Sequence, residues 1–312
     1  MKKVSILIPA YNEESTLVLL FDRLVALMNS QKNYEWEVLL VNDGSSDNSL
    51  LLMSQMYEKD NRFNYLDLSR NYGKETAMLA GFDYITGDCM VIMDADLQHP
   101  PEVIPEMIKF WEEGYDDVYA KRNERGGESY LRKKTSRWFY QLLQKLASIP
   151  IQQDTGDFRL LDKVCINALR KIRESQRYTK GMYSWIGFNK KEIIFDQQER
   201  VSGESKWNYF KLLNLAIEGI TSFTTAPLRL SSIVGMFISL GAFIYMIYVF
   251  VRALLYGDAV QGYPTLMVVI LFLGGVQLLS LGVIGEYLGR IFYETKNRPP
   301  YFARIYNGKK VD

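Results

Sequence analysis

Two carboxylates and an amide directly follow a short apolar run in the stretch Val91-Ile92-Met93-Asp94-Ala95-Asp96-Leu97-Gln98-His99. The run starts at Cys89, and Pro100-Pro101 end the loop, so the pattern predicts a buried strand over 89–93 that opens into a loop at its C-terminal end. Residues two apart on extended chain point the same way, so the side chains of three residues can offer oxygens to one point. These residues are Asp94, Asp96 and Gln98. Such a group suits a divalent metal, Mg2+ or Mn2+, although acidic residues also close many strands without binding metal.

The bulk composition limits the class of protein. A chain of 312 residues is long enough for one large soluble domain and a further part. Its formal net charge of +1 argues against a general nucleic-acid binder. Cys89 and Cys165 are the two cysteines and form no CxxC pair, so we expect neither a disulfide framework nor a zinc-thiolate site. The apolar run over 4–8 is too short for a signal peptide, so we expect the soluble part to stay in the cytosol.

Two long stretches near the C-terminus lack charged residues, 230–251 and 259–285. Each is long enough to cross the hydrocarbon core of a membrane as a helix, which predicts a hairpin of two spans over about 230–252 and 263–285. The alternative is a pair of buried core helices. Basic residues gather before the first stretch and after the second, so the positive-inside rule predicts a multi-pass protein of the inner (cell) membrane with both termini cytoplasmic. These residues are Lys206, Lys211, Arg229, Arg290, Lys296, Arg298, Arg304, Lys309 and Lys310.

The first third of the chain alternates between two kinds of pattern. Apolar runs predict strands over 4–9, 37–41, 63–68 and 89–93, and amphipathic or capped segments between them predict helices over 14–28, 48–57 and 74–85. Strands and helices in this order indicate an α/β fold with a mostly parallel sheet covered on both faces, which binds ligands at the carboxyl ends of its strands. We assign 1–228 to this domain, 229–290 to the membrane helices and 291–312 to a cytoplasmic tail.

The strand ends lack the glycine motifs of common nucleotide folds. Neither GxGxxG nor GxxxxGK[ST] occurs. Instead, Asp43 after the second strand can accept a hydrogen bond from a base, and Tyr11 after the first can stack on a ring. The combination predicts a nucleotide-diphosphate site without a glycine cradle. Simple turn capping is the alternative reading of Asp43.

Five motifs, in this order, resemble those of the polyprenyl-phosphate glycosyltransferases of family 2, such as dolichol-phosphate mannose synthases and bactoprenol glucosyltransferases. They are Ser5–Glu14 (SILIPAYNEE), Val41–Asp47 (VNDGSSD), Asn71–Lys74 (NYGK), Asp94–Glu102 (DADLQHPPE) and Arg200–Trp207 (RVSGESKW). The resemblance extends from the first strand through the membrane hairpin. It implies a GT-A fold, an inverting mechanism and a nucleotide-sugar donor.

The resemblance also implies roles for individual residues. The nucleotide-binding residues would be Pro9, Tyr11, Glu13, Asp43, Lys74 and Asp94. The metal and the diphosphate would lie between Asp94, Asp96 and Gln98. One departure concerns the second motif, which has Asn42 where many relatives have a first aspartate, so the hydrogen bonds around the base could differ.

A site that binds a lipid phosphate acceptor beside a diphosphate donor needs basic side chains, because the two phosphorylated substrates repel each other. Arginine offers a two-pronged donor that suits phosphate oxygens. The candidates for the acceptor phosphate are Arg122, Arg125, Arg132, Arg200, Ser205 and Lys206. Each basic member could instead be a solvated surface charge; the resemblance favours Arg122, Arg200 and Lys206, which we place with Asp96 among the catalytic residues.

Asp157 is the remaining acidic candidate for catalysis. The resemblance places it near the acceptor, where it would orient the attacking phosphate or act as a base. A phosphate is already anionic near neutral pH, with a second pKa of about 6, so a strong base is scarcely needed. The alternative is a turn carboxylate paired with Arg159. For His99 we expect a structural role in closing the metal loop rather than a catalytic one.

Two basic or aromatic segments have the composition of helices that lie at a membrane surface, at about 130–149 and 207–223. Either could instead pack on the soluble core or on another subunit of a homo-oligomer. At a membrane surface they would hold the active site at the level of a lipid phosphate.

These observations favour an inverting, metal-dependent glycosyltransferase that moves one sugar to a polyprenyl phosphate. The two C-terminal spans most resemble those of the bactoprenol glucosyltransferases, and this resemblance alone implies UDP-glucose as donor and undecaprenyl phosphate as acceptor. A processive polysaccharide synthase is the enzymatic alternative, but Ser136-Arg137-Trp138 lacks the glutamine of its QxxRW motif. A non-catalytic membrane scaffold with the same fold is the second alternative, although it would be expected to lose acidic ligands that this chain keeps.

Overall fold

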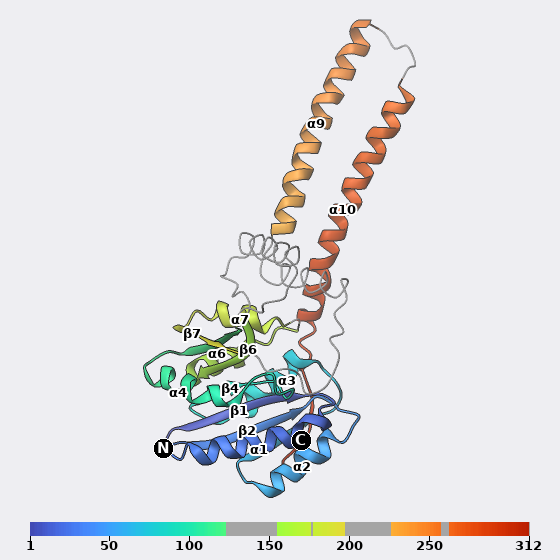
Figure 1. The fold of residues 1–312 in the computed structure, drawn as a ribbon. Helices are drawn as coiled ribbons and strands as arrows, with labels where there is room; N and C mark the ends of the chain where they lie inside the picture. Colours follow the sequence, from blue (N-terminus) through green and yellow to red (C-terminus); the bar gives the residue numbers. More distant parts are fainter. Residues whose placement is uncertain (123–154, 176, 197–225, 257–261, 312) are drawn as a thin grey trace. The chain divides into compact units, whose positions relative to one another are not determined.

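The computed structural model describes residues 1–122, 155–175, 177–196, 226–256 and 262–311 (Figure 1). The chain divides into two compact units, one of 1–216 with 299–312 and one of 217–298. The elements of the first unit are β1 (Lys3–Ala10), α1 (Glu14–Ser30), β2 (Glu35–Asn42), α2 (Ser49–Lys59), β3 (Phe63–Leu68), α3 (Lys74–Tyr84), β4 (Cys89–Ile92), η1 (Pro101–Val103), α4 (Ile104–Glu112), β5 (Asp117–Arg122), β6 (Thr155–Asp162), α6 (Lys163–Lys171), α7 (Thr179–Trp185), β7 (Lys190–Phe195), β8 (Ala303–Tyr306) and β9 (Lys309–Lys310). The second unit contains α9 (Ala226–Tyr256) and α10 (Tyr263–Thr295).

The described strands form one sheet in the order β7-β5-β6-β4-β1-β2-β3-β8-β9. The central strands β4, β1, β2 and β3 run parallel, as the sequence predicts. β6 is antiparallel to both β4 and β5, and β8 is antiparallel to both β3 and β9. The α/β fold is therefore confirmed, and its sheet is mixed because strands that enter after β4 and after α10 extend the parallel centre on both sides.

Side-chain alternation along β1 divides the core between two faces. Val4, Ile6 and Ile8 belong to one buried cluster with the inner faces of α1, α2 and α4. Leu7 points to the other face, where α3 lies so close that a Cβ on Gly81 would come within 2.1 Å of the Leu7 side chain. Because both faces are covered, the strands are buried along nearly their whole length and only their ends are free to bind a ligand.

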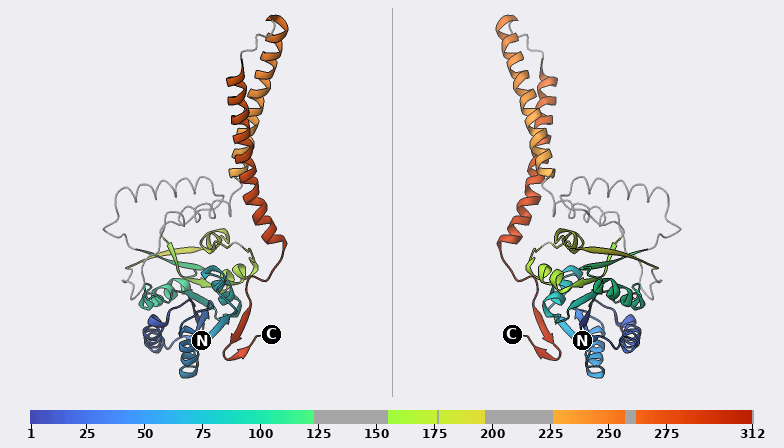
Figure 2. Two further views of the ribbon diagram at one scale, coloured as in Figure 1. Left: turned by 90° about the vertical axis from the view of Figure 1, so that its right-hand side faces the viewer. Right: turned by 90° about the vertical axis from the view of Figure 1, so that its left-hand side faces the viewer.

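The C-terminal residues are part of the first unit. The pattern of the sequence predicts a tail over 291–312. In the structure α10 continues to Thr295, and β8 and β9 then extend the sheet beyond β3, where Figure 2 shows them as red arrows beside the C-terminus. Side chains of the tail also form hydrogen bonds with the rest of the first unit. Asn307 Oδ1 accepts the backbone N–H of Tyr65, and the hydroxyl of Tyr301 donates to Asp83.

The second unit contains two long helices that contact each other, α9 and α10 (Figure 1). Within the described residues, Phe272–Thr295 is a helical segment apolar and long enough to cross a membrane, and Leu230–Tyr245 is a shorter apolar one. Large apolar side chains such as Phe237, Leu278 and Leu281 are more than half exposed on these helices. The predicted surface helices at 130–149 and 207–223 lie outside the described residues.

Candidate active site

Lys74 lies between two carboxylates at the carboxyl ends of the central strands. Its Nζ is 2.6 Å from Asp94 Oδ1 and 2.7 Å from Asp157 Oδ2. Asp94 follows β4, and Lys74 is the first residue of α3. Asp157 is near the amino end of β6, which lies at the same edge because β6 is antiparallel to β4 and Ile92 pairs with Arg159. The sheet topology thus brings together two acidic motifs that are far apart in the sequence.

The charges of this group depend on one another. Burial opposes ionisation of Asp94, but the ammonium group of Lys74 outweighs that effect and lowers the pKa of Asp94 to about 2. Burial would likewise lower the pKa of Lys74, but the two carboxylates raise it well above its ordinary value. These ion pairs keep Lys74 and Asp94 charged at neutral pH, and Lys74 neutralises part of the negative charge of the two aspartates.

Asp157 keeps one oxygen available. Its Oδ2 accepts the contact from Lys74, whereas Oδ1 is buried and has no hydrogen-bond partner among the described residues. Arg159, two residues on, forms a fully buried ion pair with Asp117 at 3.0 Å and lies over the ring of Tyr183. A buried carboxylate with an unused oxygen is suited to orient an attacking group or to accept a proton from it.

The loop after β4 holds the predicted metal ligands in a tight turn. Asp96 Oδ1 accepts the backbone N–H of Gln98 at 3.1 Å, and Leu97 between them has a φ of 61°. Asp94 and Asp96 remain half-buried, while Gln98 is buried. The described residues contain no cluster of three histidine, cysteine or acidic side chains that could hold a metal by themselves. Two carboxylates nevertheless fit Mg2+ or Mn2+, because such ions bind one or two carboxylates and complete their shell with water and substrate phosphates.

His99 closes this loop from inside, as expected for a structural residue. Its Nδ1 accepts the backbone N–H of Asp94 at 3.1 Å, and its ring stacks on Phe158 with centroids 4.8 Å apart. Burial lowers the pKa of His99 although the charge of Asp94 acts in the opposite direction. A neutral imidazole that accepts a backbone hydrogen bond fixes the position of Asp94.

The predicted nucleotide-binding residues lie on the loops after β1 and β2. Pro9 is buried in β1, Tyr11 is half exposed, and Asp43 is buried and accepts the backbone N–H groups of Tyr72 and Gly73 at 2.7 and 2.9 Å. Burial raises the pKa of Asp43 even though those two donors act against it. Asp43 therefore joins the loops after β2 and β3. It caps neither α2 nor α3, whose N-cap residues Asn48 and Gly73 have no side-chain cap hydrogen bond.

Glu13 belongs to the same electrostatic group as the metal loop. Burial raises its pKa above the ordinary value, a hydrogen bond from Thr16 opposes this, and the charges of Asp96 and Asp94 raise it further. Negative charge is therefore concentrated where the first loop meets the loop after β4. A cation bound there would relieve this repulsion.

One predicted acceptor residue is within the described part of the chain. Arg122 ends β5 with an exposed side chain, and its charge acts on His99. The other candidates, Arg125, Arg132, Arg200, Ser205 and Lys206, lie outside the described residues.

Sequence reasoning missed three residues that the fold adds to this site. Lys180 on α7 contributes positive charge at Asp94. Glu75 accepts hydrogen bonds from the backbone and hydroxyl of Thr179, which ties α3 to α7. Tyr183 is fully buried under Arg159, and its pKa is raised by burial and by the charge of Asp157. The segment around α7 has no motif, and only tertiary packing identifies it.

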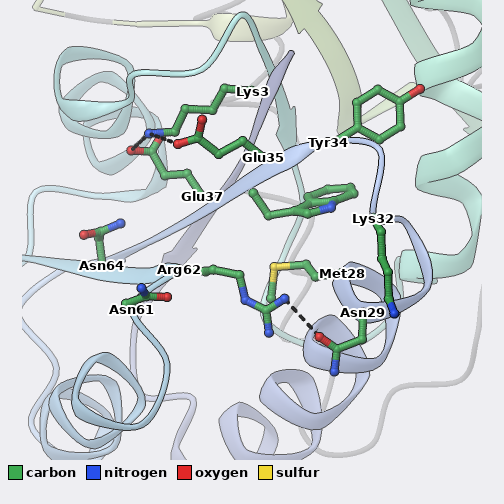
Figure 3. Close-up of a pocket in the computed structure, with 11 residues that line it drawn as sticks. Lys3, Met28, Asn29, Lys32, Tyr34, Glu35, Glu37, Asn61, Arg62 and Asn64 are labelled. Carbon is green, nitrogen blue, oxygen red and sulfur yellow. Dashed lines mark hydrogen bonds and ion pairs between the residues drawn. The ribbon is translucent and has the colours of Figure 1, made fainter. Parts of the chain in front are cut away.

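A separate cavity of about 480 Å³ lies at the opposite, amino-terminal ends of β1 and β2 (Figure 3). Lys3 pairs there with Glu35 and Glu37, and Arg62 pairs with Asp60 and bonds to Asn29. Since these charges already have protein partners, the cavity is not part of the candidate active site.

Comparison with known proteins agrees with this fold. Residues 5–170 match glycosyl transferase family 2, and residues 226–291 match the GtrB C-terminal hairpin. A bactoprenol glucosyl transferase of Shigella phage SfX is 41% identical over 302 residues, which cover 97% of this chain and 99% of that protein. A putative glycosyltransferase of Bacillus subtilis (strain 168), CsbB, is 44% identical over 306 residues, covering 97% of this chain and 92% of that protein.

A crystal structure of a mycobacterial protein has a similar fold, with a TM-score of 0.50 and 16% identity over 70% of this chain and 73% of that one. The fold is that of a GT-A-type glycosyltransferase. By its sequence the chain belongs to glycosyl transferase family 2 and has the GtrB type of C-terminal hairpin. It is therefore an enzyme that transfers a sugar.

Proposed function

We propose that the protein transfers a single glucose from UDP-glucose to a polyprenyl phosphate, undecaprenyl phosphate in particular, with inversion at the anomeric carbon. The acceptor and the sugar are supported by relatives named bactoprenol glucosyl transferase that match nearly the whole chain. The nucleotide and the inverting course are supported by the motif resemblance and by the acidic strand-end loops.

One observation carries the proposal: Lys74 joins Asp94, on the nucleotide side of the site, to Asp157, on the proposed acceptor side. Two phosphorylated substrates must meet at such a place, and the lysine lies where their charges would come closest. Lys74 would hold the donor diphosphate while it keeps Asp157 in position. This extends the nucleotide-binding role expected for Lys74 from the sequence.

In the reaction, an oxygen of the acceptor phosphate attacks the anomeric carbon as the bond from that carbon to the UDP oxygen breaks, and UDP leaves with the electron pair. The phosphate is already anionic, so Asp157 is needed mainly to orient it, with Oδ1 available for a proton. Asp94, Asp96 and Gln98 would hold a Mg2+ or Mn2+ ion, which supplies positive charge for the departing diphosphate. Arg122, and from the undescribed segments Arg125, Arg132, Arg200, Ser205 and Lys206, would bind the acceptor phosphate.

We further propose that both helices of the hairpin span the cell membrane, with the catalytic domain and both termini in the cytoplasm. The match to the GtrB hairpin and the exposed apolar side chains of α9 and α10 support membrane association. The orientation rests on the excess of lysine and arginine beside the two outer ends of the hairpin.

The test is to incubate the purified full-length protein with undecaprenyl phosphate and a panel of nucleotide sugars, with and without EDTA. We expect one hexose per lipid from UDP-glucose only, as measured by mass spectrometry, and no product in EDTA. Asp96→Ala is expected to lower the rate by about 100-fold or more. Product with several sugars would favour the processive alternative, and an active Asp96→Ala variant would contradict the assigned site.

A further inference from the structure

Arg304 in the C-terminal tail is aimed into the first unit by a bulge. β3 and β8 pair Asp67 with Ile305 and Leu68 with Ala303, so Arg304 is the extra residue between two ladder positions. A bulge of this kind redirects a side chain. The Nε of Arg304 donates to Asp67 Oδ2 at 2.6 Å, while the rest of the side chain is more than half exposed.

Asp67 connects Arg304 with Asn42, which ends β2. It is fully buried, and its other oxygen, Oδ1, accepts the side-chain amide of Asn42 at 2.7 Å. The Oδ1 of Asn42 in turn accepts the backbone N–H of Ser45 at 3.2 Å. The amide of Asn42 thus acts as a donor toward a buried carboxylate, which an ionised aspartate at position 42 could not do.

The chain of contacts continues to the first loop. Ser45 Oγ accepts the backbone N–H of Asn12 at 3.0 Å, and Asn12 Oδ1 accepts the backbone N–H of Ser46 at 2.8 Å. Asn12 has a φ of 56°, so these bonds hold a backbone conformation that few residues other than glycine adopt readily. Tyr11 and Asp43 are direct neighbours of residues in this chain of contacts.

We propose that Arg304 is a positioning residue for donor binding, which acts through Asp67 and Asn42 on the two loops that contain Tyr11 and Asp43. The inference rests on the proposed function insofar as those loops bind the nucleotide. It assigns to the tail a role in the reaction beyond completing the sheet. The tail also follows α10 directly in the chain, so the segment that leaves the membrane hairpin supplies a buried contact of the donor site.

The physical reason is the cost of an isolated buried charge. Without Arg304, the side-chain donor left to the carboxylate of Asp67 among the described residues would be the neutral amide of Asn42, and the loop would rearrange to bring another donor or water to it. Removing both charges should be far less disruptive than removing one, because an amide at 67 can still accept from Asn42.

The test compares four full-length variants in detergent: Arg304→Gln, Arg304→Lys, the double variant Asp67→Asn/Arg304→Gln, and Lys310→Gln. Lys310→Gln is the matched control, because it removes one exposed charge from β9 of the same tail. For Arg304→Gln we expect the Kd for UDP and the KM for UDP-glucose to rise by about 10-fold to 100-fold, with the KM for the lipid acceptor unchanged. Arg304→Lys and the double variant should recover most of this loss, and Lys310→Gln should match the wild type.

Hydrogen exchange gives a readout that does not depend on the nucleotide. Arg304→Gln should speed exchange in peptides that cover the amides of Ser45, Ser46, Tyr72 and Gly73, and leave α6 unchanged. Wild-type protection of these amides in Arg304→Gln, or an unchanged affinity for UDP beside a wild type that binds it, would overturn the proposal. An equal rise in the KM of both substrates would also overturn it, as general destabilisation. If the wild type binds no UDP, the proposed function fails, and the exchange data still decide whether the tail controls these loops.

Discussion

Lys74 belongs to a motif expected to bind the nucleotide, but its side chain contacts two carboxylates from other strands. It follows Asn71-Tyr72-Gly73 and begins α3, so its side chain starts at the nucleotide loops, but its ammonium group reaches Asp94 and Asp157. Lys74 contacts both carboxylates directly and neutralises part of their charge, which would otherwise repel a diphosphate. In the proposed reaction, Lys74 would therefore connect the donor side of the site with the acceptor side.

Replacing Lys74 with methionine tests this directly. We expect kcat/KM to fall by about 100-fold or more and the pKa of Asp94 to rise from about 2 toward its ordinary value, because Lys74 is the cation that holds it down. The rate is measured with the donor and acceptor of the proposed reaction. Lys2→Met removes a lysine that forms an exposed ion pair with Glu112 and is the control. Equal rates in Lys74→Met and the wild type would exclude Lys74 from the site.

Glu37, near the amino end of β2, makes the stability of the protein depend on pH. Burial would raise its pKa, but hydrogen bonds from Ser5 and Thr86 and the charge of Lys3 lower it below its ordinary value of 4.5. Because the pKa of Glu37 is lower in the folded protein, the unfolded chain binds more protons between that folded pKa and about pH 4.5. The stabilisation is therefore complete above pH 4.5 and is lost as the pH falls from there through the folded pKa.

For Glu37→Gln we accordingly expect a loss of about 1 to 3 kcal/mol at pH 7 and a smaller dependence of stability on pH below 4.5. Urea unfolding of the full-length protein in detergent at several pH values measures both quantities. Glu35→Gln, at an exposed position next to the same Lys3, is the control and should unfold as the wild type does. A Glu37→Gln variant with the pH profile of the wild type would show that the buried network is not the source of the effect.

At the scale of elements, the site depends on loops that hold one another. The loop after β2 is attached to the loop after β1 through Asn12 and to the loop after β3 through Asp43. Gly44 makes the second contact possible, because its φ is +67° and a Cβ would lie 2.4 Å from the carbonyl carbon of Arg70. The glycine is therefore required by close approach of two backbones as well as by its own conformation.

Gly44→Ala should consequently destabilise the protein by about 2 to 4 kcal/mol and weaken UDP binding. Gly114→Ala is a matched control, since Gly114 also has a positive φ, +98°, but nothing among the described residues lies within 4 Å of the added Cβ. We expect only the strain of about 1 kcal/mol there and unchanged UDP binding. Thermal unfolding and calorimetric titration with UDP separate the two effects. Equal losses in both variants would mean that the clash with Arg70 is unimportant.

At the scale of the whole molecule, the catalytic unit is discontinuous. It consists of 1–216 and 299–312, and the hairpin of α9 and α10 is inserted between them in the sequence. The tail covers the edge strand β3, which would otherwise present unpaired backbone groups, and it supplies the partner of Asp67. Folding of the unit therefore depends on residues that are made after the hairpin.

Replacing 217–298 with a flexible glycine-serine linker should leave the catalytic unit folded and able to bind UDP, since both of its parts remain. A chain that ends at 216 should instead be less stable by at least about 1 kcal/mol and bind UDP more weakly, because β8, β9 and Arg304 are missing. We expect both shortened proteins to sediment with lipid vesicles less than the full chain. Equal stability of the two shortened proteins would contradict an integral role of the tail.

The alternation of apolar strands with helices was sufficient to predict the parallel centre of the sheet, because β1 to β4 are consecutive and each strand is buried on both faces. The strand-end loops, with Asp43, Asp94 and Asp96, were predictable for the same reason: parallel strands place their carboxyl ends at one edge. The contacts of Lys180, Glu75 and Tyr183 were not predictable, because α7 is held beside the site by long-range contacts with α3 and β6. Local sequence patterns do not show which distant segments will contact each other.

The sequence by itself therefore determined the fold class, the apolar hairpin and the residue types of the site, since these follow from local periodicity and from short motifs on consecutive strands. Tertiary structure decided which of those residues meet. The antiparallel entry of β6 places Asp157 against Lys74, and the return of the tail as β8 places Arg304 on Asp67. The physical reason is that strand direction and sheet order depend on long-range pairing across the whole chain.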